Sequence, residues 1–283
     1  MTQDERRIYL IRKLLSEEKQ YRDMEIPADE QQQKRLLRAL FNIRMPKPVS
    51  PDFLEVQDQY LQEALHQKGI TDVADLTPVQ DGIYLWQGDI TTLRCGAIVN
   101  AANSQMLGCF CPNHGCIDNA IHTYAGVQLR AACAELMAQQ GHEEMETPPH
   151  LRSAADRFAQ LENALRWGEA RTGAAKITPA FNLPCDYVIH TVGPIVTGRL
   201  TVRDKDLLAS CYRSCLELAD QNGIRSIAFC CISTGEFHFP NERAAQVAVN
   251  TVKEYKEQTH SEIEVIFNVF KDYDLQIYRN LLR

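Results

Sequence analysis

The sequence predicts an α/β sandwich with several parallel strands, preceded by a helical region. From about residue 83 onward, short apolar runs alternate with helical patterns. This alternation indicates parallel strands, because parallel neighbours in a sheet need helical crossovers between them. The first 80 residues instead show apolar residues at three- and four-residue spacing, which is typical of helices. A chain of 283 residues is long enough for one large domain with an appendage.

The helical extension, residues 1–80, is expected to hold three helices. The first contains the apolar positions Ile8, Leu10, Ile11, Leu14 and Leu15. The second covers the polar segment 29–44, and prolines after it break the pattern. Pro51 can open the third helix, since proline is well tolerated in a first turn. We interpret this region as a cap or accessory subdomain.

The remaining residues, 81–283, supply the alternating elements of the predicted main domain. Strands are expected at residues 83–86, 97–103, 187–192, 226–232 and 264–270. Helices are expected at residues 118–137, 206–220, 241–255 and from residue 274 onward. An insertion at about 134–172, with a helical segment at 151–167, is expected to form a mobile loop that is able to act as a lid.

Composition and charge narrow the classes of partner. The chain carries 30 basic and 37 acidic residues, a net charge of −7, with no dense basic block. This disfavours general nucleic-acid binding, although backbone N–H groups can still hold a small phosphate ligand. No apolar run approaches the roughly 20 residues of a membrane span, and the first residues lack a secretory pattern. We therefore expect a cytoplasmic protein whose ten cysteines are reduced.

Four residues with the spacing C-x-C-x-x-H-x-C predict a zinc site: Cys109, Cys111, His114 and Cys116. Clustered thiolates and an imidazole suit Zn²⁺. Four protein ligands would make a closed, structural site, whereas two thiolates with His114 would leave a position for water or substrate. Alternate residues of an extended segment point to one side, so Cys111 is not excluded. His122 is a weaker candidate, because a core histidine is the commoner outcome.

Polar residues follow three of the expected strands and are candidates for binding a ligand. Asp89 lies in the sequence GDIT after the first strand, where it can accept from an exocyclic amine or simply cap a turn. Of Asn100 and Asn103, one is expected to anchor its turn and the other to contact a ligand hydroxyl. The segment Ser233, Thr234 and Gly235 precedes a helix and is expected to bind phosphate through backbone N–H groups.

These motifs occur in the order found in macrodomains: GDIT, IVNAAN, IDNAIH, TGAAKITPAFNLPCDYVIHTVGP and IAFCCISTGEFHFP. The chain from about residue 83 to its end resembles that family. The resemblance implies a three-layer α/β/α sandwich with a mixed central sheet and ADP-ribose as ligand. The segment CFCPNHGCIDNAIH further resembles the zinc-dependent macrodomains of microbes, which remove ADP-ribose from modified proteins.

The resemblance assigns roles to individual residues. It implies that Asp89 holds the adenine amine, with the backbone of Ile90 beside it, and that Asn103 contacts the distal ribose. Residues 173–176 would support the pyrophosphate side. The diphosphate and distal ribose would be wrapped by Ser233, Thr234, Gly235, Glu236 and Phe237.

The implied activity is that of a metal-dependent, glycosidase-type ADP-ribosyl-protein hydrolase. Zn²⁺ would be held by Cys109, His114 and Cys116. Asp118 would remain ionised beside a helix N-terminus and the cation and serve as a base or water-orienting group. The alternative role for Asp118 is the N-cap of the following helix. Glu236 would be a second base or the partner of a ligand histidine.

Two other functions remain open at this point, and the substrate is given only by the resemblance. The first is a non-catalytic ADP-ribose-binding module with a structural zinc. The second is a redox switch, because exposed thiolates oxidise and release zinc. The expected substrate is a mono-ADP-ribosylated protein. Related proteins associate this activity with a lipoylated carrier protein modified by a sirtuin-type transferase.

Overall fold

The computed structural model describes residues 1–145 and 169–283, and it contains a six-stranded central sheet. The strand order is β2-β8-β7-β4-β6-β5. Five strands are mutually parallel and β5 runs antiparallel to β6, so the sheet is mixed, as the family resemblance implies. The bounds are β2 Ile83–Gln87, β4 Ala97–Ala102, β5 Ala175–Pro179, β6 Tyr187–Val192, β7 Ser226–Phe229 and β8 Glu264–Val269.

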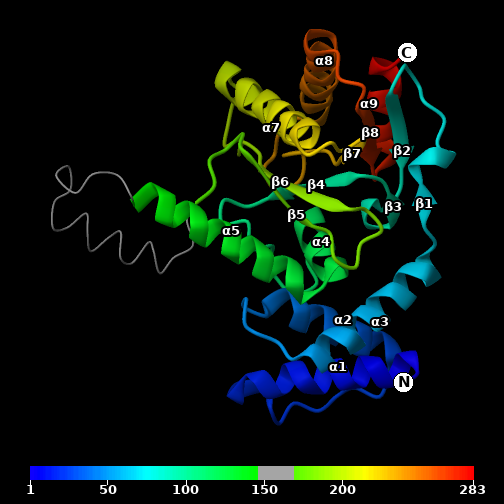
Figure 1. The fold of residues 1–283 in the computed structure, drawn as a ribbon, viewed down its shortest axis with the longest axis vertical. Helices are drawn as coiled ribbons and strands as arrows, with labels where there is room; N and C mark the ends of the chain where they lie inside the picture. Colours follow the sequence, from blue (N-terminus) through cyan, green and yellow to red (C-terminus); the bar gives the residue numbers. More distant parts are fainter. Residues whose placement is uncertain (146–168) are drawn as a thin grey trace.

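Helices cover both faces of the sheet and complete a three-layer α/β/α sandwich (Figure 1). One face carries α4 Ile117–Ala125 and α5 Val127–Met145. The other carries α7 Val202–Gln221, α8 Asn241–Thr259 and α9 Asp272–Leu281. The parallel strands are almost wholly apolar and buried, as in β7, where all four residues are buried. Strands covered on both faces need this continuous apolar character.

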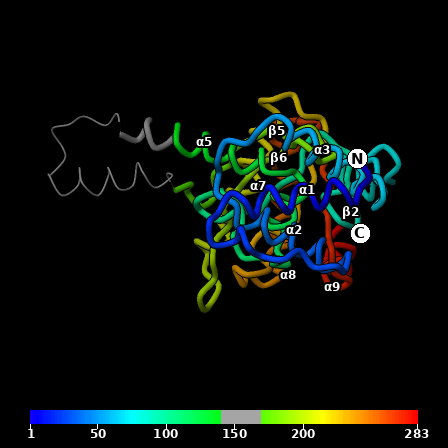
Figure 2. The backbone as a smooth tube through the Cα atoms, turned by 90° about the horizontal axis from the view of Figure 1, so that it is seen from below, coloured from blue at the N-terminus to red at the C-terminus, as the bar shows by residue number. Residues whose placement is uncertain are grey.

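The helical extension is present, with its three helices close to the expected positions: α1 Gln3–Glu17, α2 Glu30–Ile43 and α3 Pro51–Lys68. Each helix begins at a side-chain N-cap, formed by Thr2, Asp29 and Ser50 respectively. Their buried apolar residues form a cluster separate from the main core. Helix α5 contributes Val127 to this separate cluster. Figure 2, seen from the side of the extension, shows α1 and α2 lying across the body of the protein.

Several short elements lie between the main helices and strands. The strands β1 Thr71–Asp72 and β3 Leu93–Arg94 pair in parallel as a separate two-stranded sheet. Three short 3₁₀ helices are η1 Lys19–Tyr21, η2 Val73–Asp75 and η3 Ile90–Thr92.

Three details differ from the sequence prediction. The expected helix at 118–137 is two helices, because Gly126 between them has a φ of +94°, which side-chain-bearing residues rarely adopt. The edge strand β5 was not among the predicted strands. Helix α5 continues to Met145, beyond the expected start of the insertion, and the predicted helix and lid at 151–167 lie outside the described residues. Among the described residues, no helix is long and apolar enough to cross a membrane.

Candidate functional site

The loops that carry the predicted site residues leave the sheet at one edge. Strands β2, β4 and β7 are parallel members of the same sheet, so their carboxyl ends meet there. Strand β4 pairs directly with β7, which makes the loop after β4 a neighbour of the loop after β7. Ligands of open α/β sheets usually bind at this edge.

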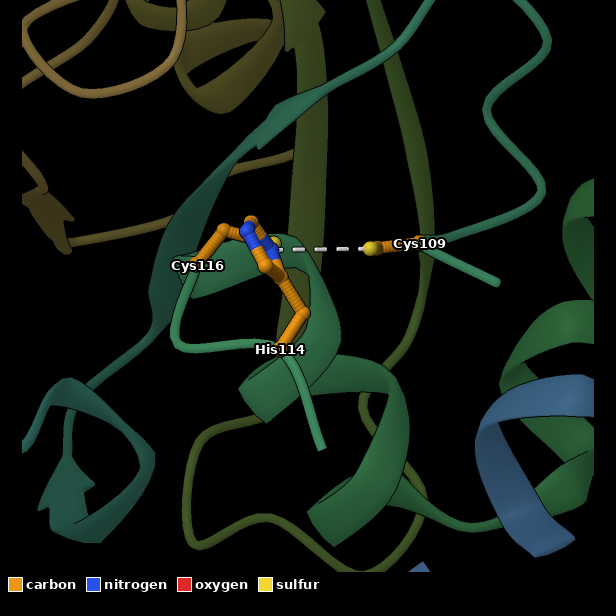
Figure 3. Close-up of side chains that lie close together, drawn as sticks. All are labelled: Cys109, His114 and Cys116. Atoms are coloured by element: carbon orange, nitrogen blue, oxygen red, sulfur yellow. Dashed lines mark hydrogen bonds between the residues drawn. The ribbon is translucent and has the colours of Figure 1, made fainter. Parts of the chain in front are cut away.

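The loop after β4 gathers three of the four predicted metal-binding residues. The donor atoms of Cys109, His114 and Cys116 all lie within 4.8 Å of one another. Figure 3 shows the three side chains close together. The Sγ of Cys109 is 3.7 Å from Nδ1 of His114. Cys111 is exposed and does not belong to this cluster. The loop therefore offers three ligands to a metal, not four.

The chemistry of this donor set fits Zn²⁺. Burial and the nearby Cys109 raise the pKa of the Cys116 thiol to about 12, so the protein alone does not stabilise a thiolate there. A bound metal ion does so, because coordination deprotonates the thiol. Two sulfur ligands and one imidazole nitrogen are a set that zinc favours. All ten cysteines are free in the structure.

Asp118 lies just beyond the cluster, inside the first turn of α4, and its side chain points into the protein. Only 5% of the residue is exposed. Its Oδ1 accepts a 2.8 Å hydrogen bond from Nδ2 of Asn100, which also lies 3.2 Å from Nδ1 of His190. The N-cap is Cys116, whose Sγ accepts from the backbone N–H of Asn119. The alternative role of Asp118 as N-cap is therefore wrong.

The sequence prediction was that a helix N-terminus and a cation keep Asp118 ionised. In the structure the largest influence on its pKa is burial, which acts in the opposite direction. Burial raises the pKa of Asp118 to about 6, and the hydrogen bond from Asn100 and the charge of Arg130 only partly oppose this. The carboxyl group is still mainly ionised at neutral pH, because its pKa lies below 7. Its Oδ1 also lies 3.5 Å from Nε2 of His122, a buried core histidine outside the Cys109, His114 and Cys116 cluster.

Glu236 meets the metal-binding loop from the loop after β7. Its Oε1 is 3.5 Å from Nε2 of His114, and its side chain is 70% exposed. The other ring nitrogen, Nδ1, faces Cys109. This arrangement favours the interpretation of Glu236 as the partner that orients a ligand histidine.

The residues predicted to hold adenine lie at the end of β2. Oδ1 of Asp89 accepts from the backbone N–H and the hydroxyl of Thr91, so Asp89 caps η3. Its Oδ2 is 3.1 Å from Nζ of Lys68 in α3. Although burial opposes ionisation, Thr91 and Lys68 hold the pKa of Asp89 below its usual value. Ile90 is buried, and its carbonyl accepts from the backbone N–H of Leu93.

Asn100 lies within β4 and Asn103 follows it, and their roles differ from the predicted division, because the buried Asn100 is not placed to contact a ligand. Asn100 is fully buried against Asp118, whereas Nδ2 of Asn103 donates to the carbonyl of Gly108 and anchors the turn. Oδ1 of Asn103 has no hydrogen-bond partner among the described residues. That oxygen is buried and unpaired, and its contact with a ligand hydroxyl stays a prediction.

The segment 233–237 has the strained backbone typical of a ligand-binding loop. Ser233 has a φ of +65°. A side chain at Gly193 would meet Oγ of Ser233 at 2.0 Å, so only glycine permits this close approach. The Ser233 hydroxyl is buried with no partner among the described residues. Residues 173–176 reach this edge indirectly, through the hydrogen bond from Gly173 to the carbonyl of Val192.

Comparison with known families agrees with this geometry. The family model described as Macro domain matches residues 99–148 and 144–248. The chain belongs to the macrodomain family. It is 53% identical over 286 residues to a protein-ADP-ribose hydrolase of Treponema medium, with 100% of both chains covered. A protein-ADP-ribose hydrolase of Staphylococcus aureus is 47% identical over 274 residues, covering 96% of this chain and 92% of that protein.

A solved macrodomain has the same fold. The crystal structure of the Trypanosoma brucei macrodomain in complex with ADP-ribose superposes with a TM-score of 0.60 and 27% sequence identity. The match covers 87% of this chain and 95% of that one.

The helical extension contacts the macrodomain at both ends of the site, which the sequence did not predict. Arg38 of α2 donates to the carbonyl of His114 at 2.9 Å and to Oδ1 of Asn119 at 2.8 Å. Asn42, also on α2, accepts from the backbone N–H of Asn113. At the other end, Lys68 of α3 contacts Asp89. The loop that carries Cys109, His114 and Cys116 is thus fixed from outside the macrodomain as well as from within it.

We expect Arg38→Met to weaken zinc binding by about tenfold, because charge-assisted hydrogen bonds to the loop are lost while the ligands stay. Competition with a chromophoric chelator measures the zinc dissociation constant. Arg12→Met is the matched control, since Arg12 is exposed on α1. Equal zinc affinity in both variants would show that α2 does not position the loop.

Proposed function

We propose that this macrodomain is a zinc-dependent hydrolase that removes mono-ADP-ribose from modified protein side chains. The observation that carries the proposal is the convergence of Cys109, His114 and Cys116 at the start of α4, next to the buried carboxyl group of Asp118. The close relatives named protein-ADP-ribose hydrolases support the reaction class.

Each part of the binding edge has a place in this scheme. The carboxylate of Asp89 accepts from the adenine amine, beside the backbone of Ile90. The segment Ser233, Thr234, Gly235, Glu236 and Phe237 surrounds the diphosphate and the distal ribose. The free Oδ1 of Asn103 accepts from a hydroxyl of the distal ribose. The scissile bond is then held near the start of α4.

At that position Asp118 acts on the attacking water. Its carboxylate, ionised at neutral pH, orients the water and accepts its proton as the bond to the acceptor side chain breaks. Asn100 holds the carboxylate in place through Oδ1. Glu236 fixes the ring of His114. Cys109, His114 and Cys116 would hold the zinc ion, which supplies Lewis-acid chemistry when bound.

The acceptor protein is specified only by the family resemblance. A lipoylated carrier modified by a sirtuin-type transferase is the partner that the resemblance implies, and no described residue supports that choice. The alternative function is a non-catalytic ADP-ribose-binding module in which zinc only rigidifies the loop.

Removal of the metal tests the proposal against that alternative. With zinc, the protein is expected to release ADP-ribose from an automodified acceptor protein, measured by loss of label from the acceptor. After chelation, release should stop while calorimetry still detects ADP-ribose binding, and added zinc should restore release. Binding without release in the zinc-loaded protein would instead identify a binding module.

A further inference from the structure

A cleft lies between the helical extension and the macrodomain, beside the proposed active site. Its volume is about 710 Å³, which is within the range of ligand-binding pockets. Residues of α1, α2 and α3 form one wall. Asn113 of the metal-binding loop and Thr123 and Tyr124 of α4 form the other.

The walls of the cleft are basic, although the protein is acidic. Five basic and two acidic side chains line it, a net charge of +3, whereas the whole chain has a net charge of −7. The basic residues are Arg7, Lys34, Arg35, Arg38 and Lys68. Their concentration makes the cleft attractive to an acidic ligand.

Both acidic side chains in the wall are already paired. Arg7 is only 3% exposed and is fixed by Asp4 at 2.8 Å and by Gln33 at 3.0 Å. Glu30 pairs with Lys34 at 2.6 Å and lies 3.7 Å from Arg7. These acids therefore offset the charges of Arg7 and Lys34. Lys68 pairs with Asp89 at 3.1 Å, so the unpaired basic residues of the cleft are Arg35 and Arg38.

Arg35 and Arg38 carry charges that no carboxylate offsets among the described residues. Arg35 is exposed. Arg38 donates only to neutral oxygens, namely the backbone carbonyl of His114 and the side-chain amide oxygen of Asn119. Arg35 and Arg38, one turn apart on α2, thus bring positive charges that are not paired with a carboxylate of the described residues to the cleft.

The cleft reaches the loop that carries the proposed metal donors. Asn113 lines the cleft and immediately precedes His114, one of the three clustered metal donors. An extended peptide gains about 3.3 Å per residue, so a few residues of an acceptor protein are enough to pass from the loop into the cleft. The segment next to a modified side chain would therefore meet Arg35 and Arg38.

We propose that this cleft binds an acidic segment of the ADP-ribosylated acceptor, rich in aspartate and glutamate and next to the modified residue. This inference rests on the proposed function, and it adds a selection among acceptors. Carboxylates of the segment would pair with Arg35 and Arg38. Substrates with neutral flanking residues would lack these contacts.

The test compares two ADP-ribosylated peptides, one with acidic and one with neutral residues beside the modified side chain. The acidic peptide is also measured without its ADP-ribose. Wild-type protein should bind the acidic modified peptide more tightly than the neutral one. Arg35→Glu should weaken binding of the acidic peptide by about fivefold, with the affinity for the neutral peptide and for free ADP-ribose unchanged. Arg35→Gln should give a smaller loss. Fluorescence anisotropy measures these affinities without hydrolysis.

The matched control is Arg203→Glu, which makes the same charge change at an exposed position of α7, on the opposite face of the sheet. An equal loss in this control would mean that only overall charge matters, and it would overturn the proposal. Equal wild-type affinity for both peptides would also overturn it. A loss of affinity for free ADP-ribose in Arg35→Glu would assign the cleft to the nucleotide instead. Peptide selectivity without any ADP-ribose release would contradict the proposed function and leave the cleft assignment supported.

Discussion

Asp118→Asn is expected to lower the rate of ADP-ribose release by about 10²–10⁴-fold, the usual contribution of a general acid or base. The reason lies in the position of the carboxylate, which is buried at the start of α4, next to the metal-binding cluster, and is mainly ionised at neutral pH. Asparagine keeps the size of the side chain and an oxygen that can still accept from Asn100. The substitution removes the negative charge and, with it, the ability to take up a proton.

The control measurements separate catalysis from binding and folding. The affinity for ADP-ribose should be unchanged, because Asp89 and the segment 233–237 supply the proposed contacts. The zinc content should also be unchanged, because Asp118 is not one of the clustered donors. Release at close to the wild-type rate would rule out Asp118 as the base and leave Glu236 as the candidate.

The fold was predictable from the sequence where it depends on local patterns. Apolar runs such as residues 226–232 identified the buried strands, and the change of spacing near residue 80 identified the extension. The break at Gly126 was missed, because a single glycine does not reveal its φ. Contacts of Arg38 with residues 76 and 81 positions away were missed for a related reason, since no local pattern encodes them.

The candidate site was predictable in its residue types and less so in its geometry. The spacing of Cys109, His114 and Cys116 was sufficient to predict that these three side chains lie together, whereas the metal itself stays a prediction. The position of Cys111 could not be predicted in this way. The sequence argument assumed an extended segment, in which Cys109 and Cys111 would point to the same side, and this segment is not extended throughout. Residues 111–114 form a turn, in which the N–H of His114 donates to the carbonyl of Cys111 and Asn113 has a φ of +56°. The turn directs Cys111 away from the cluster.

The place of Cys111 yields the second large prediction, which compares two cysteine-to-serine variants. Cys116→Ser should lose stoichiometric zinc and nearly all release of ADP-ribose, because a neutral hydroxyl is a far poorer zinc ligand than a thiolate. Serine is a good N-cap, so α4 should still begin at the same residue. Cys111→Ser should keep both the metal and the activity, since Cys111 is exposed and outside the cluster.

Metal content by mass spectrometry, release of ADP-ribose and binding of ADP-ribose should be measured on the same preparations of both variants. Loss of zinc from Cys111→Ser would show that binding of the metal draws the turn at 111–114 inward and closes a four-ligand shell. Loss of release from Cys116→Ser with binding intact supports a catalytic zinc. Loss of release and binding together would instead mean that the metal holds the loop in its binding conformation. The comparison thus decides between the two roles of zinc. A catalytic zinc takes only the release of ADP-ribose with it when it is lost, whereas a structural zinc also takes the binding of ADP-ribose.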